Sequence, residues 1–501
     1  MYSIIKLNIK DNVGIAPMDI PKNIQLEDNI TSQNEIPYGH KISLKKIEKE
    51  EFVYRYGQII GLATKPINPG EHVHSHNLGY IEEYNRKVKS QLQKNFNVLD
   101  TDKFFFQGYK RPNGKTGTRN YIGIISTVNC SATVVKAIAD RLNKSEEIKQ
   151  NINIDGIVSI KHSSGCGMNS EGYGMKVFNN TIEGFKNHPN FAKVFVIGLG
   201  CECAQISIYE EKDIEKSVVY MNIQDEGGTK KIIEKTSSAI FEQLSEINKI
   251  SRTKIPISEL IVALQCGGSD SYAGVTANPA LGFASDTIVQ NGGSTILAET
   301  PEIYGAEHLL IERAVNKKII EKLNKQIAWW KNYTSINNGS LDNNPTPGNK
   351  RGGLTTILEK SLGAVAKGGT ANLHDVLDYA EPLKNKGFNF MDSPGFDPCS
   401  VTGQVASGSN IICFTTGRGS CFGFKLTPSI KLATNTNMYN KMSDDMDINC
   451  GTIMDGIETI EESGNKIFNL IIETASGRKT KSEINGYGDE EFNPWIIGAT
   501  M

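Results

Sequence analysis

The chain has 501 residues, with 54 Lys and Arg against 56 Asp and Glu, a net charge of −2 and a pI of about 6.5. This balance gives no electrostatic footprint for nucleic acid or an anionic membrane. No apolar run approaches the roughly 20 residues that span a bilayer, and the amino terminus lacks a signal-peptide pattern. We therefore expect a cytoplasmic protein of two to four domains that acts on a small molecule.

The first 95 residues are typical of a small β domain, because short alternating runs at 4–9, 41–44 and 58–63 are separated by prolines and Asx turns. Its last strand is expected to carry His72, His74 and His76 at alternate positions, and hence on one face. Such a face suits a metal or an anionic substrate, although a solvated strand edge has the same pattern. The polar stretch 84–102 is a predicted linker.

Beyond this linker, short apolar runs that stop at glycine or polar residues alternate with helical segments. This pattern is typical of parallel strands buried on both faces of a sheet. The predicted strands are 122–128, 156–160, 194–199, 261–264, 294–298 and 410–414. The predicted helices are 131–143, 172–188, 230–247, 278–291, 306–333, 354–367 and 458–476.

The predicted fold class is therefore α/β, with domains at residues 1–95, 103–250 and 256–501. The loops at the carboxyl ends of parallel strands line the ligand crevice of such folds. Six of the nine cysteines lie in or beside predicted strand ends, and in a reducing compartment they are expected to be free thiols. These are Cys130, Cys166, Cys201, Cys203, Cys266 and Cys413. Any one of them is readily explained as a small buried hydrophobe.

Arginine and glycine-rich loops supply candidate anion sites. The Asn113-Gly114 pair predicts a hairpin turn, and it is followed by Arg119 and Asn120, whose backbone and side-chain donors suit an anion. A similar loop around Arg418 follows the predicted strand 410–414.

Several motifs together resemble the altronate and galactarate dehydratases, over nearly the whole chain. They are 71–77, Gly108-Tyr109, 117–120, Gly165-Cys166-Gly167, 198–202, 266–270, 276–282, 299–302, 415–420 and 445–451. One departure is Phe424, which stands where the resemblance leads us to expect a cysteine. Cys421 lies three residues earlier.

The resemblance implies dehydration of an aldonate or aldarate to a 2-keto-3-deoxy acid, with Fe²⁺ as cofactor under reducing conditions. It also implies an amino-terminal β-clip (SAF-like) domain, a middle domain that dimerises and a Rossmann-like carboxyl-terminal domain with the metal site. The expected partners are a sugar acid and a second copy of the chain, with no nucleic acid and no membrane. We expect altronate to be converted to 2-keto-3-deoxygluconate, with galactarate as the alternative substrate.

The reaction calls for particular residue types. A divalent cation stabilises the charge that builds on the substrate carboxylate, and other divalent cations than Fe²⁺ are also expected to fit. Asp270 and Glu299 are the expected oxygen ligands, and Cys266 and Cys450 are possible soft ligands. The three amino-terminal histidines are expected to form a lid or to add ligands.

His162 is the predicted general base, since its ordinary pKa is near neutral. Cys166, in the same loop, is a further catalytic candidate. Arg418 is expected to hold the carboxylate at the catalytic site, and Arg119, Asn120 and Lys425 are expected to bind substrate. A histidine bonded within a turn and surface salt bridges are the plainer interpretations.

Two other classes remain open at this point. A sugar-acid binding protein without catalysis would use the same crevice, although binding alone does not require acidic and histidine groups. An iron–sulfur protein would use Cys166, Cys201, Cys203 and Cys266, but the sequence lacks the usual Cys-X-X-Cys spacing.

Overall fold

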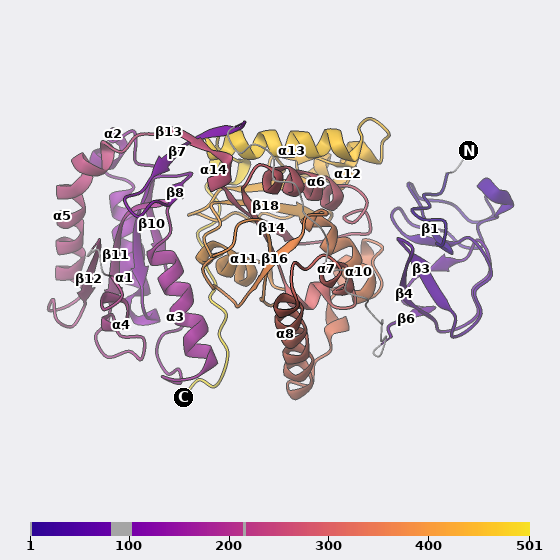
Figure 1. Cartoon of the computed structure of the whole chain (residues 1–501), viewed down its shortest axis with the longest axis horizontal. Helices are drawn as coiled ribbons and strands as arrows, with labels where there is room; N and C mark the ends of the chain where they lie inside the picture. The colour runs from indigo at the N-terminus through magenta and orange to yellow at the C-terminus, as the bar shows by residue number, and fades with distance from the viewer. Residues whose placement is uncertain (1–2, 82–102, 214–216) are drawn as a thin grey trace.

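The computed structural model describes residues 3–81, 103–213 and 217–501. The predicted linker at 84–102 lies entirely outside these residues. The chain is α/β, as predicted, with a small amino-terminal β unit at one end, a parallel sheet with its helices at the other end and a larger parallel sheet between them (Figure 1).

Two small antiparallel sheets form the amino-terminal unit. One has the order β1 (Val13–Ile15), β2 (Lys41–Ser43) and β5 (His72–Val73), and the other β3 (Phe52–Arg55), β4 (Gln58–Ala63) and β6 (Leu78–Gly79). Because β5 ends at Val73, His74 and His76 lie in the following turn. The expectation that all three histidines share one strand face is therefore wrong.

A four-stranded parallel sheet forms the middle unit, in the order β10-β9-β11-β12. Its strands are β9 (Tyr121–Ser126), β10 (Gly156–Ile160), β11 (Phe191–Gly198) and β12 (Val218–Asn222). Its helices are α1 (Asn129–Leu142), α2 (Glu146–Gln150), α3 (Tyr173–Lys186), α4 (Ser207–Glu210) and α5 (Thr229–Asn248). Strand β12, a half-buried edge strand, was not predicted from the sequence.

A three-stranded antiparallel sheet joins the middle and carboxyl-terminal units. It has the order β13 (Thr253–Pro256), β7 (Phe105–Lys110) and β8 (Thr116–Gly117). The predicted hairpin at Asn113-Gly114 connects β7 to β8, with Gly114 at a φ of 79°. Asn-Gly turns use this left-handed backbone.

The largest sheet has seven parallel strands in the order β16-β17-β15-β14-β18-β19-β20. They are β14 (Ile261–Cys266), β15 (Ser294–Ala298), β16 (Leu373–Leu377), β17 (Phe388–Met391), β18 (Ile411–Thr416), β19 (Ser429–Ala433) and β20 (Ile448–Asn449). Strand β14 is central and its residues are almost wholly buried. The sequence analysis predicted β14, β15 and β18 of this sheet.

Helices cover both faces of the seven-stranded sheet (Figure 1). They are α6 (Ala277–Gln290), α7 (His308–Ile311), α8 (Lys317–Ile336), α9 (Pro347–Arg351), α10 (Ile357–Val365), α11 (Asp397–Ala406), α12 (Thr436–Lys441), α13 (Ile460–Ala475) and α14 (Lys481–Asn485). The helix predicted at 306–333 is in fact two. Ala314 pairs with Leu373 between them, and Asn316 caps α8 by accepting the N–H of Ile319.

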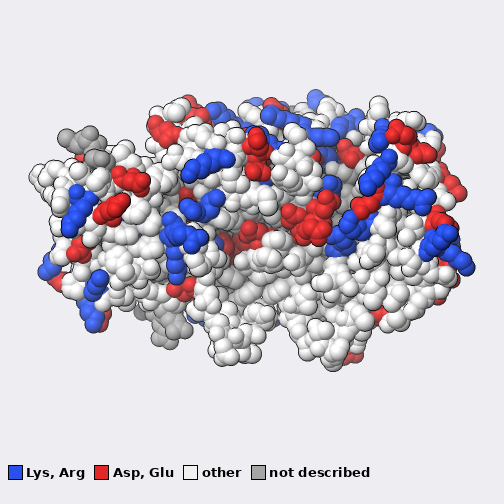
Figure 2. Space-filling model, turned by 180° about the vertical axis from the view of Figure 1, so that it is seen from behind, with Lys and Arg blue, Asp and Glu red and all other residues white. Residues whose placement is uncertain are grey.

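On the face shown in Figure 2, charged side chains of both signs are interspersed, and the surface is hollowed near its middle. No helix in the described ranges is long and apolar enough to cross a membrane.

Candidate functional site

A cavity of about 460 Å³ opens where the central strands of the seven-stranded sheet end. Cys266 is the last residue of β14, and Glu302 lies in the short helix Thr300–Ile303 that follows β15. Helix α10 contributes Lys360, and α11 contributes Asp397 at its first position. Four chemically active side chains from separate segments therefore line one cavity.

Cys266, Glu299 and Glu302 form a compact group, because one ligand atom from each lies within 4.8 Å of the others. All three are buried. Glu299 has a φ of 75°, in the left-handed region that non-glycine residues rarely adopt. Strained backbone of this kind concentrates at functional sites.

Two lysines lie against this group. Nζ of Lys367 is 2.7 Å from Sγ of Cys266, and Nζ of Lys360 is 2.6 Å from Oε1 of Glu302. Asn344 donates a further hydrogen bond to the same Glu302 oxygen, at 2.8 Å. Burial raises the pKa of Glu302, but the two lysines outweigh burial and lower that pKa below its usual value. Glu302 is therefore ionised.

Glu299 differs from Glu302 because neither of its carboxylate oxygens has a hydrogen-bond partner within the described part of the chain. Burial and the nearby Glu302 raise the pKa of Glu299 well above its usual value. Burial also raises the pKa of Cys266, to about 11. An unpaired buried carboxylate is costly, so Glu299 needs either a proton or a cation. A thiol and two carboxylates are a suitable ligand set for Fe²⁺, and the site fits such an ion.

Asp397, which the sequence analysis missed, packs against the loop after β14. A Cβ atom placed on Gly267 would lie 2.0 Å from Oδ2 of Asp397, so this approach requires glycine. Burial and the charge of Glu302 raise the pKa of Asp397 to about 7. A carboxyl with that pKa is suited to proton transfer near neutral pH.

Asp270, expected as a metal ligand, lies outside the compact group. Its carboxylate accepts hydrogen bonds from the N–H groups of Tyr272 and Ala273, from Thr434 and from Asn435, at 2.9 to 3.1 Å. Burial raises its pKa to about 6. These contacts connect the ends of β14 and β19, so the geometry gives Asp270 a structural role in place of the predicted one.

Cys450, the other expected soft ligand, is also outside the group. It is fully buried in the large apolar core and precedes the short helix Gly451–Ile453. Burial raises its pKa to about 12. The structure thus brings together only Cys266 and Glu299 of the four predicted ligands, and adds Glu302.

Arg418 lies at the rim of the cavity. Its N–H donates to the carbonyl of Gly268 at 2.8 Å, which ties the loop after β18 to a cavity-lining residue. Its side chain is exposed. This position is compatible with the predicted contact to a substrate carboxylate, which stays a prediction.

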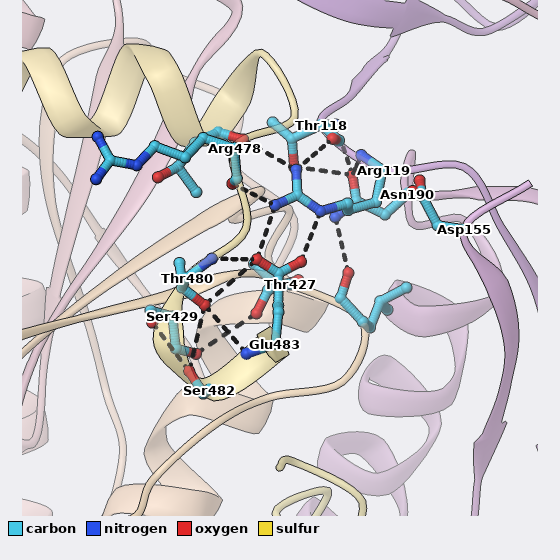
Figure 3. A network of polar contacts seen from close by, with 12 residues as sticks. Thr118, Arg119, Asp155, Asn190, Thr427, Ser429, Arg478, Thr480, Ser482 and Glu483 are labelled. Carbon is cyan, nitrogen blue, oxygen red and sulfur yellow. Dashed lines mark hydrogen bonds and ion pairs between the residues drawn. The ribbon is translucent and has the colours of Figure 1, made fainter. Parts of the chain in front are cut away.

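Arg119 and Asn120 do not line this cavity, and Arg119 belongs to a separate network of polar contacts (Figure 3). The guanidinium of Arg119 donates to both Glu483 oxygens, at 2.7 and 2.8 Å, and to the carbonyls of Thr118, Thr474 and Arg478. Asn120 is buried and bonds to Arg111, Asn153 and Asp155. All five Arg119 donors are used, so the predicted role in substrate binding is wrong.

Lys425 lines a separate cavity that Arg119 also lines, and its Nζ lies 3.5 Å from Asp489. This cavity is formed by the amino-terminal ends of β9 and β10. Lys425 therefore does not join the group at Cys266.

His162 and Cys166 belong to the middle unit, in the loop after β10. His162 is buried, accepts the N–H of Ser164 at Nδ1 and donates from Nε2 to the carbonyl of Ser126, at 2.9 Å. Burial lowers its pKa to about 4. With both ring nitrogens engaged, it is a structural histidine, and the prediction of a general base is wrong. Cys166 is exposed on the same loop.

The amino-terminal histidines lie behind the cavity wall. His40 and His72 share a contact of 3.0 Å between ring nitrogens. His40 and His74 donate to the carbonyls of Arg351 and Lys350, at the end of α9, at 3.2 and 2.9 Å. Helix α9 also carries Asn349, which lines the cavity. A lid or ligand role for His72, His74 and His76 stays a prediction.

Comparison with known families agrees with a parallel-sheet enzyme that has acidic groups at its strand ends. The altronate/galactarate dehydratase SAF domain matches residues 2–80, the D-galactarate dehydratase/altronate hydrolase second domain matches 108–248, and the D-galactarate/altronate dehydratase C-terminal domain matches 257–500.

Full-length relatives agree with these matches. The chain is 34% identical over 519 residues to altronate dehydratase of Bacillus subtilis (strain 168), with 100% of both chains covered. It is 35% identical over 489 residues to galactarate dehydratase (L-threo-forming) of Escherichia coli (strain K12), covering 95% of this chain and 93% of the relative. It is 33% identical over 495 residues to altronate dehydratase of the same organism, covering 96% and 97%. The chain belongs to the altronate/galactarate dehydratase family, and it is a hydro-lyase that dehydrates a sugar acid.

Proposed function

We propose that this enzyme dehydrates altronate to 2-keto-3-deoxygluconate in the cavity at the end of β14, with Fe²⁺ bound by Cys266, Glu299 and Glu302. The observation that carries the proposal is Glu299, a buried carboxylate without a hydrogen-bond partner in the described residues. It is held on a left-handed backbone beside a second carboxylate and a thiol. A folded protein retains such a costly arrangement where a ligand compensates for it.

When bound, a divalent cation would stabilise the negative charge that develops on the substrate carboxylate and on the leaving hydroxyl. Lys360 and Lys367 are both buried and keep their charge, because neighbouring acidic groups outweigh the effect of burial and raise the pKa of each. They hold Glu302 and Cys266 in place.

Asp397 is the proposed general base. It lines the cavity, and burial together with Glu302 raises its pKa to about 7. In its ionised form it would take the proton from C2 of the acid, as hydroxide leaves from C3. The resulting enol then tautomerises to the 2-keto-3-deoxy acid.

The lining of the cavity favours an acid with one carboxylate. Among its described lining residues, Lys360 is the single lysine or arginine, and its ammonium already bonds to Glu302 and Asn344. The other polar lining groups beyond Cys266, Glu302 and Asp397 are neutral, and suit sugar hydroxyls: Thr334, Ser340, Asn343, Asn344, Thr346 and Asn349. A second carboxylate, as in galactarate, would lack a basic partner of its own there.

The test is an anaerobic assay of the purified enzyme with Fe²⁺ and a thiol, on altronate and galactarate, with and without chelator. We expect chelator-sensitive formation of the 2-keto-3-deoxy acid, with the larger kcat/KM on altronate. Preference for galactarate would overturn the substrate assignment. Absence of turnover on any sugar acid, in protein shown to contain iron, would overturn the catalytic assignment in favour of binding alone.

We also propose that the enzyme is a homodimer formed through the middle unit, as the family resemblance implies. Sedimentation analysis of the full chain tests this, and a monomer at micromolar concentration would contradict it.

A further inference from the structure

Three exposed thiols lie at one edge of the middle sheet, well apart in sequence. Cys130 follows β9, Cys166 follows β10 and Cys201 follows β11, and all three are exposed. Strand β9 lies between β10 and β11, and both of its neighbours are parallel to it. Adjacent strands are about 4.8 Å apart, so three successive strand ends carry the three cysteines on the same edge.

Hydrogen bonds fix the three loops to one another. The N–H of Asn129 donates to the carbonyl of Ser164 at 2.8 Å, and the N–H of Ala204 donates to the carbonyl of Gly165 at 3.3 Å. Thr127 donates to Oε1 of Glu202 at 2.7 Å. The loops that carry the thiols are thus held together before any ligand binds.

Gly165 shows how close this approach is. It has a φ of 94°, and a Cβ atom placed on it would lie 2.1 Å from the carbonyl oxygen of Thr127. The loop that bears Cys166 therefore packs directly on the backbone that leads to Cys130. Only glycine allows both the backbone conformation and this contact.

Cys130 lies at the amino-terminal end of a helix. It is the second residue of α1, a helix of 14 residues whose first turn has no side-chain cap. The helix dipole at such an end favours a bound anionic group. Cys201 has a single weak contact, 3.5 Å from Nε2 of Gln224. Cys203, by contrast, is half-buried against the apolar core.

In this conformation the thiols of Cys130, Cys166 and Cys201 are too far apart for all three to bind a single ion. Among the described residues, the only group with all ligand atoms within 4.8 Å of one another is that at Cys266. Three thiolates on one tetrahedral ion would be about 3.8 Å apart, given metal–sulfur bonds of about 2.3 Å. In a four-iron cluster each thiolate binds a different iron, and the thiolate sulfur atoms are farther apart than on a single ion.

We propose that Cys130, Cys166 and Cys201 bind an iron–sulfur cluster at the carboxyl edge of the middle sheet. Its three thiolates would leave one iron of a four-iron cluster without a ligand from this set. The site is distinct from that at Cys266, and no step of the proposed dehydration depends on it. Cys266, included among possible cluster ligands on sequence grounds, lies buried at the other sheet and is not part of it.

The test is anaerobic reconstitution of the full chain with Fe²⁺ and sulfide, followed by gel filtration and measurement of iron, acid-labile sulfide and visible absorption. We expect bound iron and sulfide in comparable amounts, and loss of the sulfide and of the iron bound with it in Cys130→Ser, Cys166→Ser and Cys201→Ser. Cys203→Ser is the matched control and should retain both. Circular dichroism and thermal unfolding of each variant verify that it is folded.

Glu299→Gln separates this proposal from the proposed function, because it should lose turnover yet keep the labile sulfide. Wild-type protein that binds iron without sulfide would overturn the cluster. Equal amounts of sulfide in the wild type and in all three serine variants would also overturn the cluster. The same holds if the Cys203→Ser control loses as much sulfide as those variants.

Discussion

Two buried glutamates of the carboxyl-terminal unit differ in whether basic side chains form hydrogen bonds with their carboxylates. Glu359 of α10 is fully buried and accepts hydrogen bonds from Lys41, Arg55 and Thr355, with 2.9 Å to Lys41 Nζ. Glu299 is equally buried, but its oxygens have no hydrogen-bond partner in the described residues. Burial raises the pKa of both, but Lys41 and Arg55 outweigh it at Glu359 and lower that pKa to about 2. The pKa of Glu299 stays well above its usual value.

Glu359 is a buried carboxylate that holds two units of the chain together, whereas we infer that Glu299 is left unpaired for a ligand. Lys41 and Arg55 come from the amino-terminal unit, so Glu359 fixes that unit to the cavity-bearing one. A satisfied buried carboxylate stabilises the structure only while its partners remain. An unsatisfied one beside a cavity, such as Glu299, destabilises the protein without its ligand.

The largest expected effect is that of Glu299→Gln. We expect kcat to fall by about 10²–10³-fold, the typical result of removing a group that stabilises transition-state charge. The melting temperature should stay the same or rise, because a neutral amide costs less to bury than a lone carboxylate. Steady-state kinetics and calorimetry measure both. Near wild-type kcat would place the catalytic centre elsewhere.

Glu359→Gln should give the converse result. Lys41 and Arg55 would lose their carboxylate, and removing one member of a buried ion pair costs about 3–5 kcal/mol. Chemical denaturation and limited proteolysis of the amino-terminal unit measure the loss, with the exposed Glu312→Gln as matched control. Molecules that remain folded should retain the chemical step. An unchanged stability would show that this network contributes nothing to assembly.

Asp397→Asn tests the proposed general base of the cavity. A general base typically contributes about 10²-fold or more, so kcat should fall by at least that factor. Because the pKa of Asp397 is about 7, wild-type activity should decline as the pH falls below 7. That acidic limb should be absent in the variant. An identical pH profile in both proteins would exclude Asp397 as the base.

A smaller effect is expected from pH on the histidines that contact α9. Burial and the other histidines lower the pKa of His72 to about 3, and burial and Lys41 lower that of His74 to about 4. The undocked unit therefore takes up more protons below pH 6.5, and docking is strongest above that pH. It should weaken as the pH falls from 6.5 toward 4. Proteolysis rates across this range, compared with those of a His72→Gln, His74→Gln double variant, measure the effect. Equal pH dependence in both proteins would contradict it.

The sequence alone predicted the strands that carry the candidate site better than it predicted which side chains form that site. Buried apolar runs located β14, β15 and β18, and Cys266 and Glu299 lie at or directly after the carboxyl ends of two of these strands. Glu302, Lys360 and Lys367 were missed, because only tertiary packing brings them together. Helix α10 packs against the short helix Thr300–Ile303, and the turn Ala366–Gly368 that follows α10 packs against β14. Asp270 was misassigned, since a sequence does not reveal that Thr434 and Asn435 already occupy its oxygens.

The same reason explains the errors in the middle unit. Arg119 and His162 stand in glycine-rich loops, which is a pattern that anion sites and structural turns share. Whether such a side chain is free depends on partners as distant in sequence as Glu483 for Arg119. Local pattern carries no information on those partners.

We propose that Glu299 is unpaired because it binds the catalytic cation. Anaerobic titration of three proteins with Fe²⁺, in the absence of sulfide, tests this directly. To remove any contribution from the middle unit, all three carry serine at positions 130, 166 and 201. One has no other change, one adds Glu299→Gln and one adds Asp270→Asn. We expect one tight Fe²⁺ site per chain in the first and third proteins, and the loss of this site in the second. Stoichiometric Fe²⁺ binding by the Glu299→Gln protein, or loss of binding only in the Asp270→Asn protein, would contradict it.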